Sequence, residues 1–124
     1  MKTQKNRERV TFITTEDGDD LIVSFAIEDD EPGEIVSLIL LRTPKYESLL
    51  VEGERGVSVS LESEFDDNED YLRRIRLGTP ATTIETTCKR YELDVSRVDS
   101  SELKAARQIL RRMNFDRRFV LELG

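Results

Sequence analysis

The sequence predicts an α+β fold: an antiparallel β-meander sheet of about six to eight strands, packed against one C-terminal amphipathic helix and followed by a final strand. Two observations carry this prediction. Before residue 96, short segments of alternating hydrophobic and polar residues are separated by turn residues. Only residues 100–113 repeat their hydrophobic positions at helical spacing, and residues 119–123 alternate again.

The size and composition of the chain fit one domain. It has 124 residues, of which 37% are hydrophobic and 36% charged. A chain of this length buries about two thirds of its unfolded surface, so it needs no metal or disulfide to fold. No repeat or linker divides it, so we expect a single α+β domain over 1–124, with 1–8 as a flexible N-terminal arm.

The first hairpin is predicted at Asp17-Gly18, between the alternating segments 10–16 and 20–28. Asp-Gly favours a type I′ turn, which needs positive φ at both positions. In the resulting register Glu16 opposes Asp19 and Ile13 pairs with Ile22. The other face of this hairpin then gathers Val10, Phe12, Thr14, Leu21, Val23 and Phe25.

The third strand is predicted over 35–42, after a type II turn at Pro32-Gly33. Because residues 35–41 are hydrophobic on both faces, we expect this strand to be central and to lie beneath the helix. Thr43-Pro44 then favours a short helix through Leu50. An edge strand over 44–52 fits equally well, and the sequence does not separate the two.

A second hairpin is predicted between strand 57–65 and a strand that begins at Tyr71, with 66–70 as its loop. In this register Phe65 opposes Tyr71, and Glu62 pairs with Arg74. The apolar pairs are Leu61 with Ile75 and Val59 with Leu77, and Ser60 meets Arg76.

The turn 78–81 leads into a strand predicted over 82–95. Its inward residues change parity from Ile84, Thr86 and Cys88 to Tyr91, Leu93 and Val95, which indicates a β-bulge near Lys89-Arg90. Cys88 is interpreted as a small buried hydrophobic residue, since free cysteines are commonly buried.

The helix over 100–113 has signals at both ends. Asp99 or Ser100 is expected as N-cap, with Glu102 reaching back in a capping box. Its hydrophobic stripe is Leu103, Ala106, Ile109, Leu110 and Met113. Asn114 is expected to end the helix in the left-handed conformation. The last strand, 119–123, is expected at an exposed edge that could pair with a second copy of the chain.

Catalytic chemistry has few candidates. The chain has no histidine and one cysteine, which removes Ser-His and Cys-His nucleophiles and His- or Cys-based zinc sites. A calcium loop at Asp66, Asn68 and Asp70 fails at its sixth and twelfth positions, where Tyr71 and Leu77 stand. We therefore assign no catalytic, cofactor-binding or metal-binding residue.

Charge is distributed unevenly along the chain. Residues 16–70 hold 18 acidic and 3 basic side chains, whereas residues 71–124 hold 7 acidic and 12 basic ones. A nucleic-acid surface in the second half would use Arg73, Arg74, Arg76, Lys89, Arg90, Arg107, Arg111, Arg112, Arg117 and Arg118. The overall charge of −7 and the lack of interleaved aromatic residues favour neutralisation by the acidic half instead.

These patterns predict a non-catalytic interaction or regulatory domain, with a homodimer as one form and another protein as the alternative partner. Nucleic-acid binding through the Arg-rich half is the second hypothesis, and a carboxylate-based metal-binding protein or enzyme is the third. The longest hydrophobic run, 35–41, is too short to cross a membrane, and the first ten residues have no hydrophobic signal. A cytoplasmic location without membrane contact is expected.

Overall fold

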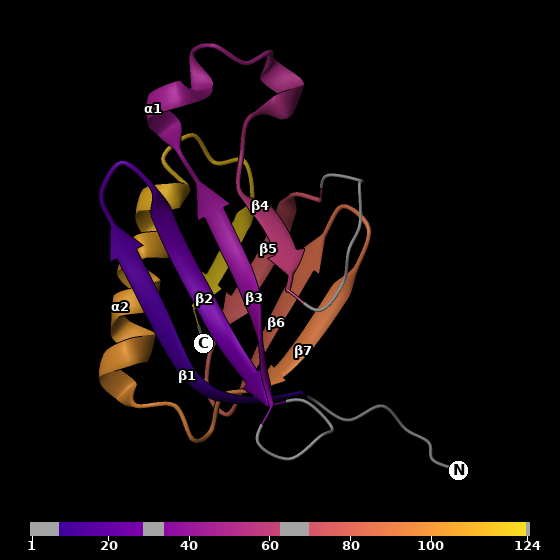
Figure 1. The fold of residues 1–124 in the computed structure, drawn as a ribbon, viewed down its shortest axis with the longest axis vertical. Helices are drawn as coiled ribbons and strands as arrows, with labels where there is room; N and C mark the ends of the chain where they lie inside the picture. The colour runs from indigo at the N-terminus through magenta and orange to yellow at the C-terminus, as the bar shows by residue number, and fades with distance from the viewer. Residues whose placement is uncertain (1–7, 29–33, 63–69, 124) are drawn as a thin grey trace.

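The computed structural model describes residues 8–28, 34–62 and 70–123 (Figure 1). The elements in chain order are β1 (Glu8–Asp17), β2 (Leu21–Glu28), β3 (Ile35–Arg42), α1 (Pro44–Glu47), a 3₁₀ turn (Glu52–Glu54), β4 (Ser58–Leu61), β5 (Leu72–Leu77), β6 (Ala81–Thr86), β7 (Arg90–Asp94), α2 (Ser100–Met113) and β8 (Val120–Leu123). The predicted α+β class is confirmed.

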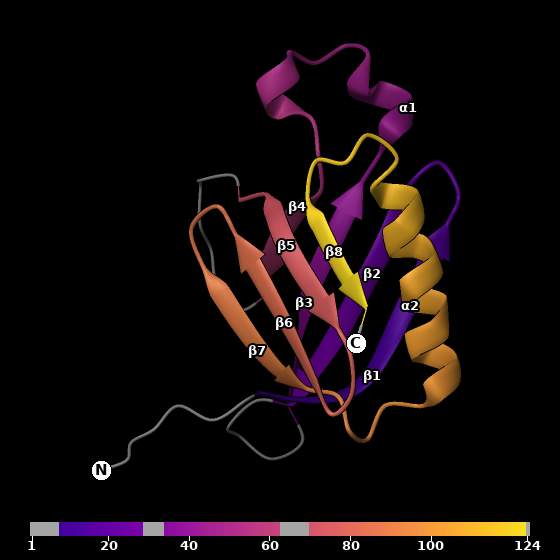
Figure 2. The same ribbon diagram turned by 180° about the vertical axis from the view of Figure 1, so that it is seen from behind.

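The strands form one eight-stranded sheet in the order β4-β3-β2-β1-β7-β6-β5-β8. The sheet doubles over, so that β1–β4 form a first layer and β5–β8 a second layer behind it (Figures 1 and 2). Strand β1 joins the layers: Glu8 and Arg9 pair with β7, and the rest of the strand pairs with β2. The β1–β7 and β5–β8 pairs are parallel, so the sheet is mixed, although most of its pairs are antiparallel.

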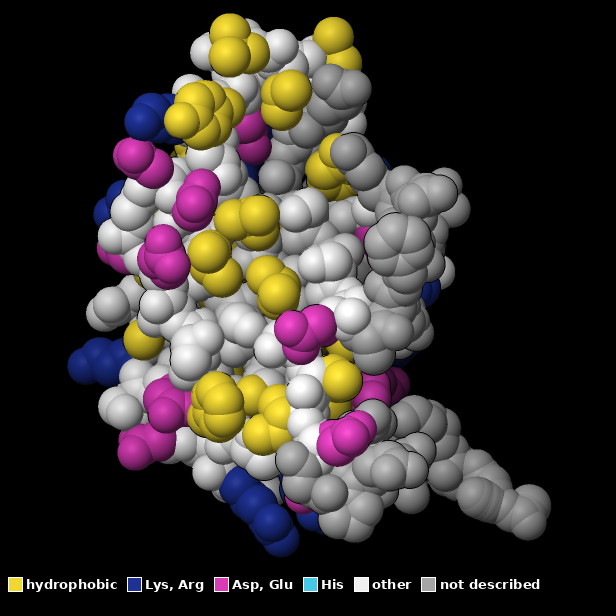
Figure 3. All heavy atoms as spheres, in the orientation of Figure 1, with side chains coloured by type: hydrophobic (Ala, Val, Ile, Leu, Met, Phe, Trp, Pro, Cys, Tyr) yellow, Lys and Arg dark blue, Asp and Glu magenta, His cyan; other side chains and the backbone are white. Residues whose placement is uncertain are grey.

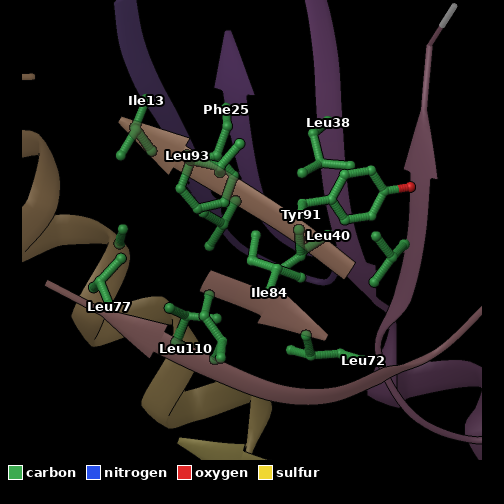
Figure 4. Close-up of a cluster of buried hydrophobic side chains, with 14 of the residues drawn as sticks. Ile13, Phe25, Leu38, Leu40, Leu72, Leu77, Ile84, Tyr91, Leu93 and Leu110 are labelled. Carbon is green, nitrogen blue, oxygen red and sulfur yellow. The ribbon is translucent and has the colours of Figure 1, made fainter. Parts of the chain in front are cut away.

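The hydrophobic core lies between the two layers (Figure 4). Phe25, Leu38 and Leu40 of the first layer face Ile84 and Leu93 of the second, and all five are fully buried. Burial of such a side chain stabilises the fold by about 1.5–3 kcal/mol. Each strand layer thus covers most of the inner face of the other.

Helix α2 lies along the side of the molecule and packs on β1, β2 and β8. The prediction that β3 lies beneath this helix is therefore wrong. The inward side chains of β3, Leu38 and Leu40, face the second layer instead. One face of this hydrophobic strand is covered, by another strand layer in place of the helix, and its other face is not.

The first hairpin is confirmed, but its predicted register is wrong. The loop has three residues, 18–20, in which the Gly18 N–H donates to the Asp20 carbonyl oxygen over 3.2 Å. Ile13 consequently opposes Phe25 and is buried, while Phe12 is exposed. Among the described residues only Gly56 and Arg117 have positive φ, so Asp17-Gly18 does not form the type I′ turn.

Strand β4 pairs mainly with β3, where Leu61 opposes Leu38. The predicted β4–β5 register is wrong: an isolated bridge joins Ser58 to Tyr71. Glu62 does not pair with Arg74 but accepts a hydrogen bond from the Ser37 N–H over 3.1 Å. Most of the predicted loop 66–70, Phe65, and the Pro32-Gly33 turn lie outside the described residues.

The segment predicted as one bulged strand is a hairpin of β6 and β7, in which Ile84 opposes Tyr91. The inward residues were predicted correctly up to Thr86 and from Tyr91 onward, since all of them are buried. The change of parity comes from the turn 87–89, so the predicted bulge is wrong. Cys88 lies in that turn and is exposed, contrary to the expectation of burial.

Helix α2 begins and ends where the sequence predicts, and Ala106, Ile109, Leu110 and Met113 are buried. Asp99 caps it by accepting a hydrogen bond from the Ser101 N–H over 3.0 Å. No helix within the described residues is long and hydrophobic enough to cross a membrane.

Two details at the ends of α2 differ from the prediction. The Glu102 carboxylate makes no capping box; its Oε1 accepts from the Ile13 N–H of β1 over 2.8 Å. Asn114 has φ of −98°, so the expected left-handed stop is wrong, and Arg117 adopts positive φ instead. Glu102 therefore joins α2 to the sheet rather than closing its own helix end.

The Glu102–Ile13 bond generates a first prediction. Glu102→Ala should lower the free energy of unfolding by about 1–2 kcal/mol, because the part-buried Ile13 N–H loses its acceptor. Amide hydrogen exchange should accelerate at Ile13 while the amide of Ser101 keeps its protection. Gln108→Ala, on the exposed side of α2, is the matched control. Unchanged exchange at Ile13 would contradict this role for Glu102.

Candidate interaction site

The projection, defined as residues 43–57, extends beyond the sheet between β3 and β4 (top of Figure 1). Pro44 begins α1 because its fixed φ suits the first helical position. The helical alternative for 44–52 is thus confirmed, although α1 ends at Glu47, before Leu50. Thr43 makes no side-chain cap; its hydroxyl donates to Asp20 Oδ1 over 2.6 Å and holds the projection to the first hairpin.

Hydrophobic side chains are exposed together on this projection. Leu49 is 82% exposed, Val51 67% and Tyr46 56%, and Leu50 beside them is exposed as well. Figure 3 shows hydrophobic side chains gathered at this end of the molecule. Single exposed hydrophobic residues are common, but several on one protruding element are typical of an interaction site.

The base of the projection is built around a buried guanidinium. Arg42, the last residue of β3, is 1% exposed, and all five of its N–H donors are bonded. Nε and Nη2 donate to the Glu47 carboxylate over 2.9 and 2.7 Å. Nη1 and Nη2 donate to Asp116, each over 2.8 Å, and Nη1 also donates to the Met113 carbonyl oxygen over 2.7 Å.

Further contacts extend this network across the projection. Asp116 also accepts from Arg118 Nε over 2.7 Å, and Arg118 Nη2 donates to Glu52 over 2.6 Å. Glu47 accepts a third hydrogen bond, from the Gly56 N–H over 3.3 Å. Gly56 has φ of +130°, a conformation that side-chain-bearing residues rarely adopt. The projection is therefore held to the segment that follows α2 through Arg42 and Glu52, and Gly56 near its end is held to Glu47.

The network sets the charge of its members. Burial alone would lower the pKa of Arg42, but its hydrogen bonds to Asp116 and Glu47 outweigh burial and raise it. Burial would raise the pKa of Glu47, yet the hydrogen bonds from Arg42 and Gly56 lower it. The Arg42 hydrogen bond likewise holds the pKa of Asp116 well below its usual range. All three groups stay charged at neutral pH, which suits an anchor and not proton transfer.

An aromatic ring adds to the same cluster. The Arg42 guanidinium carbon lies 4.2 Å from the centre of the Phe115 ring, in cation–π contact. Phe115 is otherwise exposed, in the loop after α2. It therefore extends the exposed hydrophobic group of the projection toward the end of the helix.

The basic residues considered for nucleic acid do not form one surface. They divide between the outer face of the second layer, helix α2 and the loop after it. Several are paired with carboxylates: Arg74 with Glu122, Arg90 with Glu85 and Glu92, Arg112 with Asp17, and Arg118 with Asp116 and Glu52. Pairing of this kind neutralises the positive potential that phosphate binding needs.

The acidic residues considered for calcium are only partly described. Asp66 and Asn68 lie outside the described residues. Asp70 holds the 87–89 turn, since its carboxylate accepts from the Thr86 hydroxyl over 2.6 Å and from the Cys88 N–H over 3.0 Å. The described part of the chain contains no group of three metal-ligating side chains.

Arg42 was not predicted as a functional residue, although its position in β3 carries a signal. Arg42 has the same parity in β3 as the inward Leu38 and Leu40, so its position alone indicates a buried charge. Glu47, five residues later, is a visible partner. Asp116 is far away in sequence, and its role becomes apparent only in the folded chain. Comparisons with protein-family models, with curated proteins and with solved structures found no match.

The Arg42 network generates a second prediction. Arg42→Met should lower the free energy of unfolding by about 3–5 kcal/mol, because Glu47 and Asp116 lose the charge that compensates them. Urea denaturation measures this loss. Replacing all three charges together, by Arg42→Met, Glu47→Gln and Asp116→Asn, should restore part of the stability. Arg73→Met, at an exposed position, is the control, and an equal loss there would contradict the buried anchor.

A pH dependence follows from the same pKa shifts. The pKa values of Glu47 and Asp116 are lowered on folding, so their contribution to stability is complete above the ordinary carboxylate pKa of about 4. It should decrease as the pH falls below that value. Urea denaturation at neutral and acid pH should show this decrease in wild type and a smaller one in the Arg42→Met variant. An equal decrease of the free energy of unfolding with pH in both proteins would show that Glu47 and Asp116 contribute nothing through Arg42.

Proposed function

We propose that this chain is a non-catalytic protein-interaction domain that forms a homodimer through its projection. The observation that carries the proposal is the exposure of Tyr46, Leu49 and Val51 on an element anchored by a buried, fully bonded arginine. Burial of these side chains against a partner supplies the free energy of association. A second copy is the simplest partner, because twofold dimers are the commonest assemblies.

The anchoring supports this proposal through the cost of binding. A mobile loop loses conformational freedom when a partner holds it, and that loss reduces affinity. Here Arg42 fixes α1, and Arg55 donates to the Leu50 carbonyl oxygen over 3.2 and 3.1 Å. The projection is therefore ordered before a partner arrives, and it presents its hydrophobic side chains in one arrangement.

The chemistry of the charged groups favours binding over catalysis. Glu47 and Asp116 have lowered pKa values, so neither is suited to act as a general acid or base near neutral pH. The sequence contains no histidine to take that role. We place the domain in the cytoplasm, because an exposed unpaired thiol such as Cys88 suits a reducing compartment.

The edge strand β8 offers a second route to the dimer. Within the described sheet β8 pairs only with β5, and both Val120 and Leu123 are exposed. Pairing between two such edges would extend the sheet. The projection is the stronger candidate, because its exposed hydrophobic group is larger and includes an aromatic residue.

The dimer can be tested by light scattering coupled to size exclusion, from low to high micromolar concentration. Wild type should associate, and high salt should leave the association intact because the contact is hydrophobic. The double variant Leu49→Ser, Val51→Ser should be monomeric and should melt at the temperature of wild type diluted until it is monomeric, since both side chains are exposed. Val120→Ser should dimerise like wild type. A monomeric wild type at every concentration would overturn the homodimer, and loss of association in Val120→Ser would assign it to β8.

A further inference from the structure

The outer face of the first layer, meaning the outward side chains of β1–β4, has no charge in its middle. The strand registers place these residues in rows across the sheet. One row is Thr14, Ser24, Ile39 and Ser60; a second is Ile22, Leu41 and Ser58; a third is Phe12, Ala26 and Ser37. In Figure 3 hydrophobic and uncharged side chains occupy most of this face, and an acidic side chain lies between its upper and lower hydrophobic groups.

The outer face of the second layer is different. There Arg74 opposes Glu85, which opposes Arg90, and Arg76 lies between Glu122 and Thr83. Alternating charges of this kind keep a sheet face solvated. The same chain thus has one charged face and one face without charge in its middle, where Ile22, Ile39 and Leu41 are half-buried among serine and threonine side chains. An uncharged face with this hydrophobic content is suited to contact with a partner.

Carboxylates stand along the margins of the uncharged face. Glu16 opposes Ile22 at the β1 margin, Glu28 opposes Ile35, and Glu62 follows β4 beside Ser37. The basic residue beside them, Arg9, is bonded to Glu28 over 3.0 Å. Figure 3 shows Lys and Arg side chains only near the outline of the molecule in this view. The border is therefore predominantly negative.

We propose that this face binds a cationic amphipathic segment of another protein. Hydrophobic side chains of the segment would cover Ile22, Ile39 and Leu41, and its Lys or Arg residues would meet Glu16 and Glu62. Glu28 keeps its ion pair with Arg9. Exposed ion pairs add little affinity but select the partner and speed its association. The hydrophobic contact then supplies most of the affinity.

Charge argues against the other occupants of this face. A second copy paired face to face would place carboxylate margins against each other, which opposes association. Nucleic acids and anionic membranes carry phosphates that the same carboxylates repel. The partner chemistry that remains is a positively charged border around a hydrophobic centre.

A titration with two synthetic peptides tests the proposal. One peptide alternates leucine and lysine, and the other has glutamate in place of every lysine. The full chain, labelled with ¹⁵N, should show amide shift changes confined to the outer-face residues of β1–β4 on addition of the lysine peptide. The glutamate peptide should cause none. Shift changes spread equally over both layers, or equal binding of the glutamate peptide, would overturn the proposal.

Variants separate the hydrophobic contribution to peptide affinity from the contribution of charge. Ile39→Thr with Leu41→Thr keeps residues that favour strands and should weaken the lysine peptide about tenfold. Val120→Thr, on the outer face of the second layer, should leave the affinity unchanged. Glu16→Gln with Glu62→Gln should weaken binding about threefold and reduce its salt dependence, whereas Glu85→Gln should do neither. Unchanged affinity in the Ile39 and Leu41 variant would also overturn the proposal.

This inference does not depend on the homodimer. The Leu49→Ser, Val51→Ser variant should bind the lysine peptide like wild type, because its changes lie in the projection. Failure of the dimer would leave peptide binding intact, and failure of peptide binding would leave the dimer intact. A dimer that dissociates in the Ile39 and Leu41 variant would show that a second copy covers the face, against the proposal.

Discussion

The projection depends on the burial of one charged side chain, Arg42. A guanidinium removed from water is tolerated only when its donors and its charge are compensated, and here two carboxylates and one carbonyl oxygen provide this. The ligands come from α1, from the last residue of α2 and from the loop that follows. One residue at the end of β3 thereby joins α1, the end of α2 and the loop that follows. The position of the exposed hydrophobic side chains follows from this arrangement.

In the fold, the acidic and basic parts of the chain occupy different parts of the molecule. The acidic first half forms the first layer and the projection, and the second layer carries alternating charges on its outer face. Neutralisation of the basic half occurs through several local pairs and not through one contact between two charged surfaces. The first layer keeps its carboxylates at the margins, so its character is that of a hydrophobic face with a negative border.

The sequence predicted local structure better than long-range pairing. Helix α2 was located to the residue because Asp99 and its hydrophobic stripe are local signals. The first hairpin was located, but a loop of three residues in place of two exchanged the roles of Phe12 and Ile13. Strand β4 pairs mainly with the preceding strand β3, across the projection, and not with β5, which follows after a shorter connection. In the candidate site, the burial of Arg42 could be predicted from its position in β3, which matches that of Leu38 and Leu40. Its pairing with Asp116 could not be predicted, because the two residues are far apart in the sequence.

The double role of β1 has a consequence for how the chain folds. Glu8 lies beside Leu93, so the first strand of the domain meets its parallel neighbour only after most of the chain is in place. Pairing between such distant residues requires a large loop to close. The loss of chain entropy on closure comes before the stabilising contacts form, which slows folding. During synthesis the first layer emerges long before β7 and α2, with its inward hydrophobic residues uncovered. The interval between emergence and closure is therefore the period in which this protein is most exposed to aggregation.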